Sequence, residues 1–468
     1  MKEIRPEVEQ QIEQDYAEMM DRRKFFKRTL VTGGALAAGA TSALAEAQTA
    51  NLPPNIPRWS RYLGPGVTSR GYGQPSEFEA HVKRGNVSWL TASPNSSISF
   101  TPLQHLHGII TPNGLHFERH HGGMPSISPE EHRLVIHGGQ DENGKDLLSR
   151  PLMFTMDDLQ RFPSESRIHF IECPANSGME WKGVQMSSVQ FTHGMISCCE
   201  WTGVKVSTLL QEAGIDPEFV KQALYAKDKT HQELADEGKD AANGAWCLAE
   251  GADAGAMDRS IPLWKLLDDA MIVYAQNGEA LRPEQGYPIR LLVPGFEGNM
   301  NIKWIRRLKL GIHPWRTREE TSKYTDLLED GQAREFTWMQ DTNSVITSPS
   351  VGQKLEKPGR YELRGLAWTG RGTIRRVDVS LDGGRNWTTA ELQSPVLSKC
   401  LTRFRMPFDW SPGQTMMLQS RAMDETGFVQ PTLAQLRDAR GVNSIYHKNA
   451  IYTWKLDEKG DLHNVQMG

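Results

Sequence analysis

The 468-residue sequence has no run of 18 apolar residues and no excess of basic residues. The first absence excludes a transmembrane helix in the mature protein, so we expect no membrane partner. The 53 Lys and Arg residues against 57 Asp and Glu residues give a net charge of −4, which excludes a generally basic nucleic-acid-binding protein. The 42 glycines and 26 prolines, about one residue in seven, favour a strand-rich and loop-rich protein over a helical bundle.

Cysteine is scarce as well. The five cysteines are Cys173, Cys198, Cys199, Cys247 and Cys400. None stands in a C-x-x-C or C-x-x-C-H pattern, so the chain itself carries no c-type haem. An odd number of cysteines in an oxidising compartment leaves at least one thiol unpaired or bound to another group. Because vicinal cysteines cannot easily close a relaxed disulfide, we interpret Cys198 and Cys199 as small buried hydrophobes.

The N-terminus resembles a twin-arginine export signal. Asp21–Lys27 contains two adjacent arginines followed by two phenylalanines and a lysine, and a weakly hydrophobic Gly/Ala-rich stretch follows over Thr29–Ala45. Small residues at 43–47 offer cleavage sites. We therefore predict a signal peptide over residues 1–45, export of the folded protein to the periplasm, and insertion of a cofactor before export. The alternative is an amphipathic N-terminal helix on a cytosolic protein.

The next part of the chain has an α+β pattern. Residues 51–100 are rich in Pro, Gly, Ser and Asn, and we expect an irregular, wrapping segment there. Over residues 101–320, short strands and helices alternate without regular βαβ spacing. The expected elements are strands at Arg133–His137, Arg167–Cys173 and Tyr287–Val293, and helices at Ser207–Ala213 and from Ser260-Ile261-Pro262 onward.

After Val345 the helical period disappears and apolar residues alternate strictly with polar ones. The alternating apolar residues are Val377, Val379 and Leu381, and then Phe404, Met406 and Phe408. This period of two predicts half-buried strands, with turns at Asp382–Gly384 and Asp424–Gly427. Such strands over about 120 residues favour an immunoglobulin-like β-sandwich. We therefore expect one domain over residues 46–335 and a second over residues 336–468.

Three groups of residues are candidates for chemistry. Cys173 lies between a predicted strand and a Pro/Gly-rich loop, where a thiol can ligate a metal or attack a substrate, although buried packing is the simpler interpretation. Five histidines within residues 105–121 indicate either a metal site or a polar wall around an anion or cofactor, and their spacing matches no zinc motif. Arg119, Arg290 and Lys303 can bind an anion, although each alone is more simply a surface charge.

Several segments, taken together and in order, resemble the sulfite oxidase family of molybdenum-cofactor enzymes. They are Phe117–His121, Glu172–Asn176, Glu250–Asp253, Ser260–Leu263, Gly286–Arg290, Val293–Gly295 and Lys303-Trp304. In addition, Asp382–Trp387 resembles part of the family's dimerisation domain. The resemblance covers nearly the whole mature chain, and it implies an α+β fold with a molybdopterin-binding catalytic domain followed by an immunoglobulin-like dimerisation domain.

The resemblance also implies roles for eight residues. Cys173 is the implied thiolate ligand of molybdenum in a molybdenum-molybdopterin cofactor, since soft sulfur ligands suit this metal. Tyr324 and Arg119 are the implied catalytic residues, with Tyr324 in hydrogen-bonding reach of a molybdenum ligand and able to pass a proton. The alternative for Tyr324 is an ordinary semi-buried loop tyrosine. The implied cofactor contacts are Arg119, His121, Asp253, Arg290, Asn301 and Lys303.

The chain departs from the family pattern at three positions. Ser177 stands where an arginine usually lines the substrate pocket, Gln285 where a histidine usually contacts the cofactor, and His120 where an asparagine is usual. A pocket with less fixed positive charge suits a larger, tethered sulfur substrate. These departures resemble the sulfane dehydrogenase branch of the family. That resemblance implies a sulfur-carrier protein of the thiosulfate-oxidising system, a c-type cytochrome partner, and a homodimer through the C-terminal domain.

Three alternatives stay open at this point. The first is a sulfite:cytochrome c oxidoreductase acting on free sulfite, which would be favoured if Arg364, Arg371 or Arg375 of the second domain entered the pocket. The second is an exported molybdenum reductase acting on sulfoxides, although such relatives lack the C-terminal sandwich. The third is a non-enzymatic adhesin or binding protein that uses the sandwich domain.

Overall fold

The computed structural model of the chain describes residue 72 and residues 75–88, 96–335 and 337–467. Residues 76–468 form one compact unit, to which all the elements below belong. The signal peptide that we predict over residues 1–45 lies outside the described residues. None of the described helices combines the length and the apolar character needed to cross a bilayer.

A three-stranded antiparallel sheet opens the compact unit. It contains β1 (Gly85–Asn86), β2 (Ser97–Phe100) and β3 (Glu118–His120), with β2 in the centre. The prediction of irregular structure over residues 51–100 is therefore wrong at β2. Its hydrogen-bond partners come from β3, which lies some twenty residues further along the chain and which no local pattern identifies.

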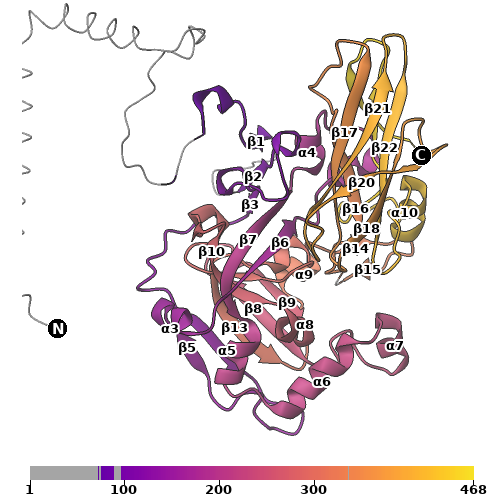
Figure 1. The fold of residues 1–468 in the computed structure, drawn as a ribbon. Coiled ribbons are helices and arrows are strands. Elements are labelled where there is room, and N and C mark those ends of the chain that lie inside the picture. The colour runs from indigo at the N-terminus through magenta and orange to yellow at the C-terminus, as the bar shows by residue number, and fades with distance from the viewer. Residues whose placement is uncertain (1–71, 73–74, 89–95, 336, 468) are drawn as a thin grey trace, which may run out of the picture. The chain divides into compact units, whose positions relative to one another are not determined.

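Two five-stranded sheets form the body of the first half (Figure 1). The first has the order β11-β10-β7-β6, with β12 also paired to β10, and the second has the order β5-β4-β13-β8-β9. The strands of the first sheet are β6 (Glu165–Glu172), β7 (Ile196–Lys205), β10 (Met271–Gln276), β11 (Glu279–Ala280) and β12 (Arg290–Leu292). Those of the second are β4 (Leu134–Gly138), β5 (Leu152–Phe154), β8 (Trp246–Gly251), β9 (Asp258–Pro262) and β13 (Ile305–Gly311).

Short helices cover these sheets and close their core. They are α3 (Met156–Arg161), α4 (Val189–His193), α5 (Val206–Glu212), α6 (Pro217–Lys227), α7 (His231–Asp236), α8 (Leu263–Asp268) and α9 (Arg318–Thr321). The apolar faces of α5 and α8 join strand residues such as Ile136, Trp246 and Leu308 in one buried cluster. Burial of this apolar surface is the main stabilising contribution in this half.

Most of the predicted elements of this half are present within one or two residues. The expected strands at Arg133–His137 and Arg167–Cys173 correspond to β4 and β6, and the expected helix at Ser207–Ala213 corresponds to α5. The strand expected at Tyr287–Val293 is shorter, because Pro288 has no N–H group to donate to a ladder.

The helix that we expected to open at Ser260-Ile261-Pro262 begins later. These three residues end β9, and α8 starts at Leu263 with Pro262 as its N-cap residue. Pairing with β8 determines the conformation of this segment, since Ser260 lies opposite Leu248 and Ile261 lies opposite Cys247. A tertiary contact here overrides the local helix signal.

The second half is the predicted immunoglobulin-like sandwich of two antiparallel sheets (Figure 1). One sheet contains β16 (Asn343–Ser348), β17 (Gly359–Trp368), β21 (Thr402–Trp410) and β20 (Glu391–Gln393). The other contains β19 (Thr388–Thr389), β18 (Ile374–Ser380), β22 (Met416–Asp424), β23 (Thr453–Leu456) and β24 (Leu462–Val465). The hairpin β14 (Asp326–Leu327) and β15 (Ala333–Arg334) precedes the sandwich, and α10 (Leu433–Arg440) packs beside it. On β21, Phe404, Met406 and Phe408 are buried, which confirms the predicted alternation.

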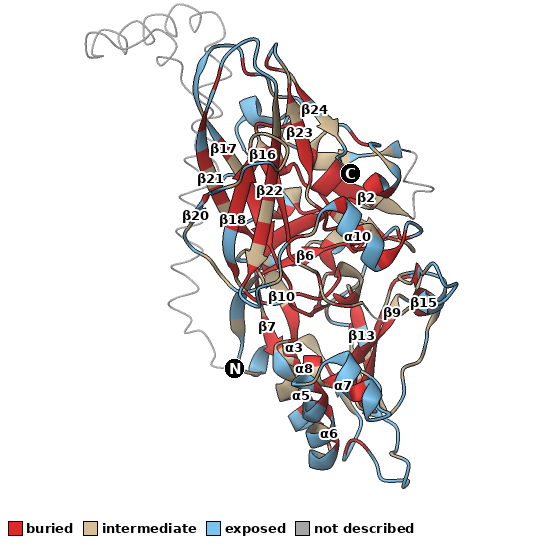
Figure 2. Cartoon of the chain, turned by 90° about the vertical axis from the view of Figure 1, so that its right-hand side faces the viewer, coloured by how far each residue is buried: buried red, intermediate tan, exposed pale blue. Residues whose placement is uncertain are grey.

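The two halves share a continuous core (Figure 2). Phe170 of β6 and Ile196 of β7 belong to the same buried cluster as Trp368 and Phe404 of the sandwich. The Phe170 amide also donates to the Lys399 carbonyl oxygen at 3.1 Å. The sandwich therefore packs directly against the strand β6 that leads to Cys173. The boundary between domains that we place at residues 335 and 336 stays a prediction.

The sandwich core leaves no room for a side chain at Gly365 of β17. A Cβ atom there would lie 2.2 Å from the Phe404 ring and 2.4 Å from the Val345 carbonyl oxygen. Overpacking of this kind lowers the free energy of unfolding, and we expect Gly365→Ala to lower it by about 2 kcal/mol in chemical denaturation. Gly108→Ala is the matched control, because a Cβ atom at Gly108 would meet nothing within 4 Å. Equal stability of the two variants would contradict the close packing of these sheets.

Candidate active site

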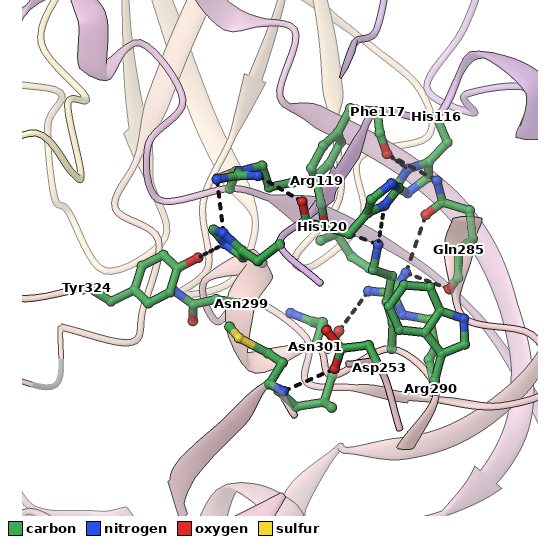
Figure 3. Close-up of a pocket in the computed structure, with 18 residues that line it drawn as sticks. His116, Phe117, Arg119, His120, Asp253, Gln285, Arg290, Asn299, Asn301 and Tyr324 are labelled. Atoms are coloured by element: carbon green, nitrogen blue, oxygen red, sulfur yellow. Dashed lines mark hydrogen bonds between the residues drawn. The ribbon is translucent and has the colours of Figure 1, made fainter. Parts of the chain in front are cut away.

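One cavity, of about 690 Å³ including its open mouth, gathers the residues that the sequence singled out (Figure 3). All eight predicted site residues line it, namely Arg119, His121, Cys173, Asp253, Arg290, Asn301, Lys303 and Tyr324. They come from β3, from the loop after β6, from the loop after β8, from β12, from the segment before β13 and from the segment after α9. The convergence is observed, whereas the role of each residue stays a prediction.

Cys173 directly follows the last residue of β6, and its surroundings hold it firmly. Its backbone amide donates to the Met195 carbonyl oxygen at 3.0 Å. The buried Glu172 carboxylate accepts hydrogen bonds from Asn176 Nδ2 at 2.9 Å and from Trp368 Nε1 of the sandwich at 2.8 Å. Burial raises the pKa of the Cys173 thiol to about 11, so the thiol stays protonated unless a bound metal ion lowers its pKa.

Three side chains at the cavity form a hydrogen-bonded series (Figure 3). Arg119 Nη2 lies 3.1 Å from His121 Nδ1, and His121 Nε2 lies 3.1 Å from the Tyr324 hydroxyl oxygen. Burial and the neighbouring Arg119 charge lower the pKa of His121 to about 4, so the imidazole is neutral at pH 7.

This series determines the tautomer of His121. A guanidinium group only donates, so His121 Nδ1 accepts from Arg119 and carries no proton. The neutral ring must then hold its proton on Nε2 and donate it to the Tyr324 oxygen. The hydroxyl hydrogen of Tyr324 is therefore free for a different acceptor. Burial raises the pKa of Tyr324 well above its ordinary value, so its hydroxyl stays protonated.

Two cations, the buried Arg290 and the partly buried Lys303, also line the cavity. Arg290 Nη2 donates to the Asn301 carbonyl oxygen at 2.9 Å, and Lys303 Nζ donates to the carbonyl oxygens of Arg119 and Glu284, both at 3.1 Å. Burial lowers the pKa of Arg290 to about 9 and that of Lys303 to about 7. Across the described ranges, neither cation forms an ion pair with a carboxylate, and the buried Arg290 Nε has no hydrogen-bond partner. An anion in the cavity would supply the missing partner.

Asn301 differs from the other predicted cofactor contacts. Its Oδ1 accepts from the Val293 amide at 2.7 Å, and its Nδ2 donates to the Glu297 carbonyl oxygen at 3.1 Å. The side-chain amide thus holds the loop that precedes it, while the backbone carbonyl binds Arg290. The Asp253 carboxylate likewise accepts from the Met257 amide at 3.0 Å and keeps its other oxygen for the cavity side of its loop.

The cavity is also lined by residues to which the sequence analysis assigned no role in the site. They are His116, Phe117, His120, Ile171, Met257, Gln285, Gly298, Asn299, Ile302 and Trp304. His116 and His120 belong to the histidine cluster, and burial lowers the pKa of each to about 3, so both rings are neutral. This agrees with a polar wall. Within the described residues no group of three or more His, Cys, Asp or Glu side chains is placed to hold a metal ion. The alternative of a histidine metal site therefore has no ligand group among these residues. Asn299 carried no signal in the sequence.

The positions that distinguish the substrates lie outside the cavity lining. Ser177 is buried with a φ of 60°, and it does not contribute to the lining. Arg371 pairs with Asp341 at 2.6 Å, and Arg375 pairs with Glu425 at 3.4 Å. Among the described residues that line the cavity, none of Arg364, Arg371 and Arg375 is present. The second half therefore adds none of these three arginines to the cavity.

Comparisons with known proteins agree with this arrangement. The family model of the oxidoreductase molybdopterin binding domain matches residues 121–318, and that of the Mo-co oxidoreductase dimerisation domain matches residues 334–454. The crystal structure of the sulfane dehydrogenase SoxCD from Paracoccus pantotrophus matches with a TM-score of 0.79 and 48% identity, covering 88% of this chain and 98% of that chain.

Curated relatives are more distant and longer. Mitochondrial sulfite oxidase from Homo sapiens is 28% identical over 363 residues, which is 73% of this chain and 62% of that protein. The NADH nitrate reductase from Solanum lycopersicum is 30% identical over 333 residues, which is 64% of this chain and 33% of that protein. The chain thus spans less than two thirds of the length of each of these relatives.

The buried Lys303 predicts a specific pH dependence of the cofactor-free protein. Its pKa falls from 10.5 to about 7 on folding, so between these values the unfolded chain binds the proton and the folded chain does not. Stability must then rise with pH across this window. In chemical denaturation, the free energy of unfolding of Lys303→Met should rise by about 2 kcal/mol less than that of the wild type between pH 7 and pH 9. The exposed Lys221→Met is the control, and an unchanged pH slope in Lys303→Met would contradict the burial of the charge.

The cavity residues fit a molybdopterin. The two buried cations and the unpartnered Arg290 Nε suit its phosphate, and the Cys173 thiol at the cavity wall supplies a soft ligand for the metal. The matches cover both halves of the chain, and they agree with the motifs, the two-part fold and the chemistry of the cavity. The chain belongs to the sulfite oxidase family of molybdopterin oxidoreductases, and its cofactor is molybdenum-molybdopterin.

Proposed function

We propose that the protein is a molybdenum-dependent oxidoreductase that oxidises sulfane sulfur held on a cysteine of a carrier protein during thiosulfate oxidation. The observation that carries this proposal is the meeting of Cys173, the Arg119–His121–Tyr324 series and two buried cations around one cavity. The 48% identity to a sulfane dehydrogenase supports the substrate class.

The residues of the chain have distinct tasks in this reaction. When bound, molybdenum-molybdopterin supplies two-electron oxidation with oxygen-atom transfer. Cys173 would hold the metal as a thiolate, while Arg290 and Lys303 would hold the phosphate of the pterin. Tyr324 would donate or accept a proton at the cavity, because His121 already occupies its oxygen and leaves its hydroxyl hydrogen available.

The charge of the cavity supports a carrier-bound substrate over free sulfite. Sulfite is a small dianion that needs fixed positive charge at its binding position. The sequence has Ser177 in place of the family's arginine, Ser177 itself does not line the cavity, and Arg371 and Arg375 of the second half are paired with Asp341 and Glu425. A sulfur atom tethered to a carrier protein brings its own binding surface and needs less charge inside the cavity.

Electrons must leave through a partner protein. The sequence has no C-x-x-C-H motif, so the chain itself carries no c-type haem to accept them. We propose a separate c-type cytochrome as the acceptor, which would bind through a transient interface near the cofactor. The match to a dimerisation domain over residues 334–454 supports a homodimer through the sandwich. We further propose that residues 1–45 direct the protein to the periplasm by the twin-arginine route.

A spectroscopic titration tests the substrate. The air-oxidised protein should show a visible thiolate-to-molybdenum charge-transfer band, which dithionite bleaches. We expect free sulfite to leave the band unchanged and the sulfane-loaded carrier to bleach it. Prompt bleaching by sulfite would instead support a sulfite:cytochrome c oxidoreductase. A folded, molybdenum-replete preparation without any such band would overturn the proposed site.

A substitution at Tyr324 tests its proton-transfer role. Tyr324→Phe removes the hydroxyl group and keeps the ring, so the oxidation rate should fall by about 10²-fold, as for loss of a general acid or base. The charge-transfer band should persist, because Cys173 is unchanged. The control is Tyr225→Phe, whose exposed hydroxyl bonds to Glu237 and to nearby lysines, none of which lines the cavity. A Tyr324→Phe variant as fast as the wild type would rule out the role.

A further inference from the structure

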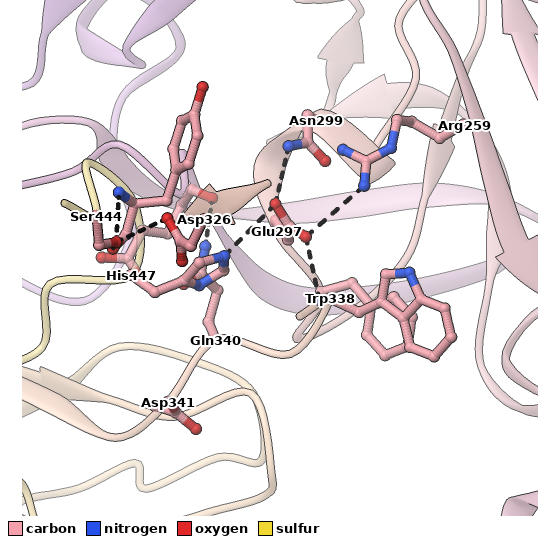
Figure 4. A network of polar contacts seen from close by, with 12 residues as sticks. Arg259, Glu297, Asn299, Asp326, Trp338, Gln340, Asp341, Ser444 and His447 are labelled. Atoms are coloured by element: carbon pink, nitrogen blue, oxygen red, sulfur yellow. Dashed lines mark hydrogen bonds and ion pairs between the residues drawn. The ribbon is translucent and has the colours of Figure 1, made fainter. Parts of the chain in front are cut away.

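A short segment of the second half, Ser444–His447, contacts both the loop of the predicted metal ligand and the loop of a predicted catalytic residue. Figure 4 shows Ser444 of this segment beside Asp326. One loop contains Cys173 and the other contains Tyr324. The segment belongs to the region matched by the dimerisation-domain model, so no similarity to the cofactor-binding domain assigns it to the site. We call it the 444–447 segment.

On one side, the 444–447 segment holds the loop of Tyr324. Ser444 Oγ donates to Asp326 Oδ1 at 2.7 Å, and Arg440 Nη1 lies 3.4 Å from Asp326 Oδ2. The rings of Tyr446 and Tyr324 lie with centroids 5.4 Å apart and planes tilted by 39°. This centroid separation lies within the range of favourable aromatic contacts.

On the other side, the same segment holds the loop of Cys173. The His447 amide donates to the Pro174 carbonyl oxygen at 2.7 Å, and Trp181 Nε1 donates to the Tyr446 carbonyl oxygen at 3.2 Å. A Cβ atom at Gly178 would lie 2.2 Å from the Ile445 carbonyl oxygen, so the two backbones touch. The backbone of Tyr446 is thus held by residues of the first half, close to the loop of Cys173.

Tyr324 needs such support, because its own backbone is unfavourable. Its φ is 50°, in the left-handed region that a bulky residue rarely adopts. Its side chain is only partly buried, and its hydroxyl must stay 3.1 Å from His121 Nε2. Its ring contacts the buried Tyr446 and the Arg259 guanidinium, whose carbon lies 5.2 Å from the ring centroid. The first of these comes from the second half.

We propose that Tyr446 is a positioning residue, which holds the ring of Tyr324 so that its hydroxyl stays against His121. The proposal rests on the proposed proton-transfer role of Tyr324. The ring of Tyr446 has this task, because it contacts the ring of Tyr324, whereas the Tyr446 hydroxyl group bonds to the backbone of Tyr324. The second half would therefore take part in catalysis through a buried tyrosine as well as forming the dimer.

A double-mutant cycle tests whether Tyr446 acts through Tyr324. Tyr446→Leu should lower kcat by at least about 10-fold with little change in KM, because a displaced catalytic group loses rate steeply. In the Tyr324→Phe background, Tyr446→Leu should change kcat by less than about 2-fold, since the group it positions is already absent. Tyr446→Phe keeps the ring and should restore the rate. Equal losses in both backgrounds would overturn the proposal.

The control variant is Tyr361→Leu. Tyr361 also belongs to the second half and contacts another ring, Phe408, at 6.0 Å, but Phe408 does not line the cavity, whereas Tyr324, the partner of Tyr446, does. Tyr361→Leu should leave kcat unchanged. All variants should keep the molybdenum content and the charge-transfer band of the wild type. Loss of the band in Tyr446→Leu would mean that Tyr446 supports the Cys173 loop instead, which contradicts the proposal.

A second measurement needs no substrate and no turnover. In protein labelled with 3-fluorotyrosine, the ¹⁹F resonance of Tyr324 is identified by its loss in Tyr324→Phe. A held ring gives two separate rotamer signals, and we expect these to merge in Tyr446→Leu but not in Tyr361→Leu. Unchanged rotamer signals in Tyr446→Leu would overturn the proposal. An inactive wild type with the expected ¹⁹F result would overturn the proposed function alone.

Discussion

The cavity contains two cations, Arg290 and Lys303, that form no ion pair with a carboxylate among the described residues. Arg290 and Lys303 line one cavity, and burial lowers the pKa of both because water no longer solvates their charge. A charge in this state destabilises the folded chain until an anion neutralises it. The surrounding segments hold these side chains through backbone carbonyl groups and the neutral side chains of Gln285 and His120, so no wall contact neutralises their charge. A phosphate-bearing cofactor resolves this conflict, and cofactor binding thereby becomes part of the stability of the fold.

The second half is part of the site as well as a separate architectural unit. Its core is continuous with β6, and Trp368 donates to the carboxylate of Glu172, the residue directly before Cys173. Gln340 Nε2 also donates to the Glu172 carbonyl oxygen at 3.0 Å. These contacts cross from one half of the chain to the other, so a displacement of the sandwich would move Cys173, the predicted metal ligand. Rigidity of the loop after β6 therefore depends on packing between the halves.

Charge distribution supports the proposed carrier-bound substrate. Arg119 bonds to His121 and Lys303 to backbone oxygen atoms, so part of the positive charge at the cavity is engaged with its own walls. In the sandwich, Arg371 and Arg375 are paired with carboxylates, and neither they nor Arg364 line the cavity. Recognition of a sulfur substrate would then depend on surfaces outside the cavity, which a carrier protein provides and a free ion does not.

The sequence alone determined the class of fold, the family, and the identity of eight residues that line the cavity. Short motifs carry this information because each places a few side chains at a strand end or in a tight loop, as for Cys173 after β6. Tertiary structure decided what depends on partners remote in the sequence. It made Ser260–Pro262 the end of β9 by pairing with β8, and it brought Tyr446 of the second half against Tyr324. Local patterns cannot specify such contacts, since their energy comes from pairing and packing with other segments, in the case of Tyr446 more than a hundred residues away.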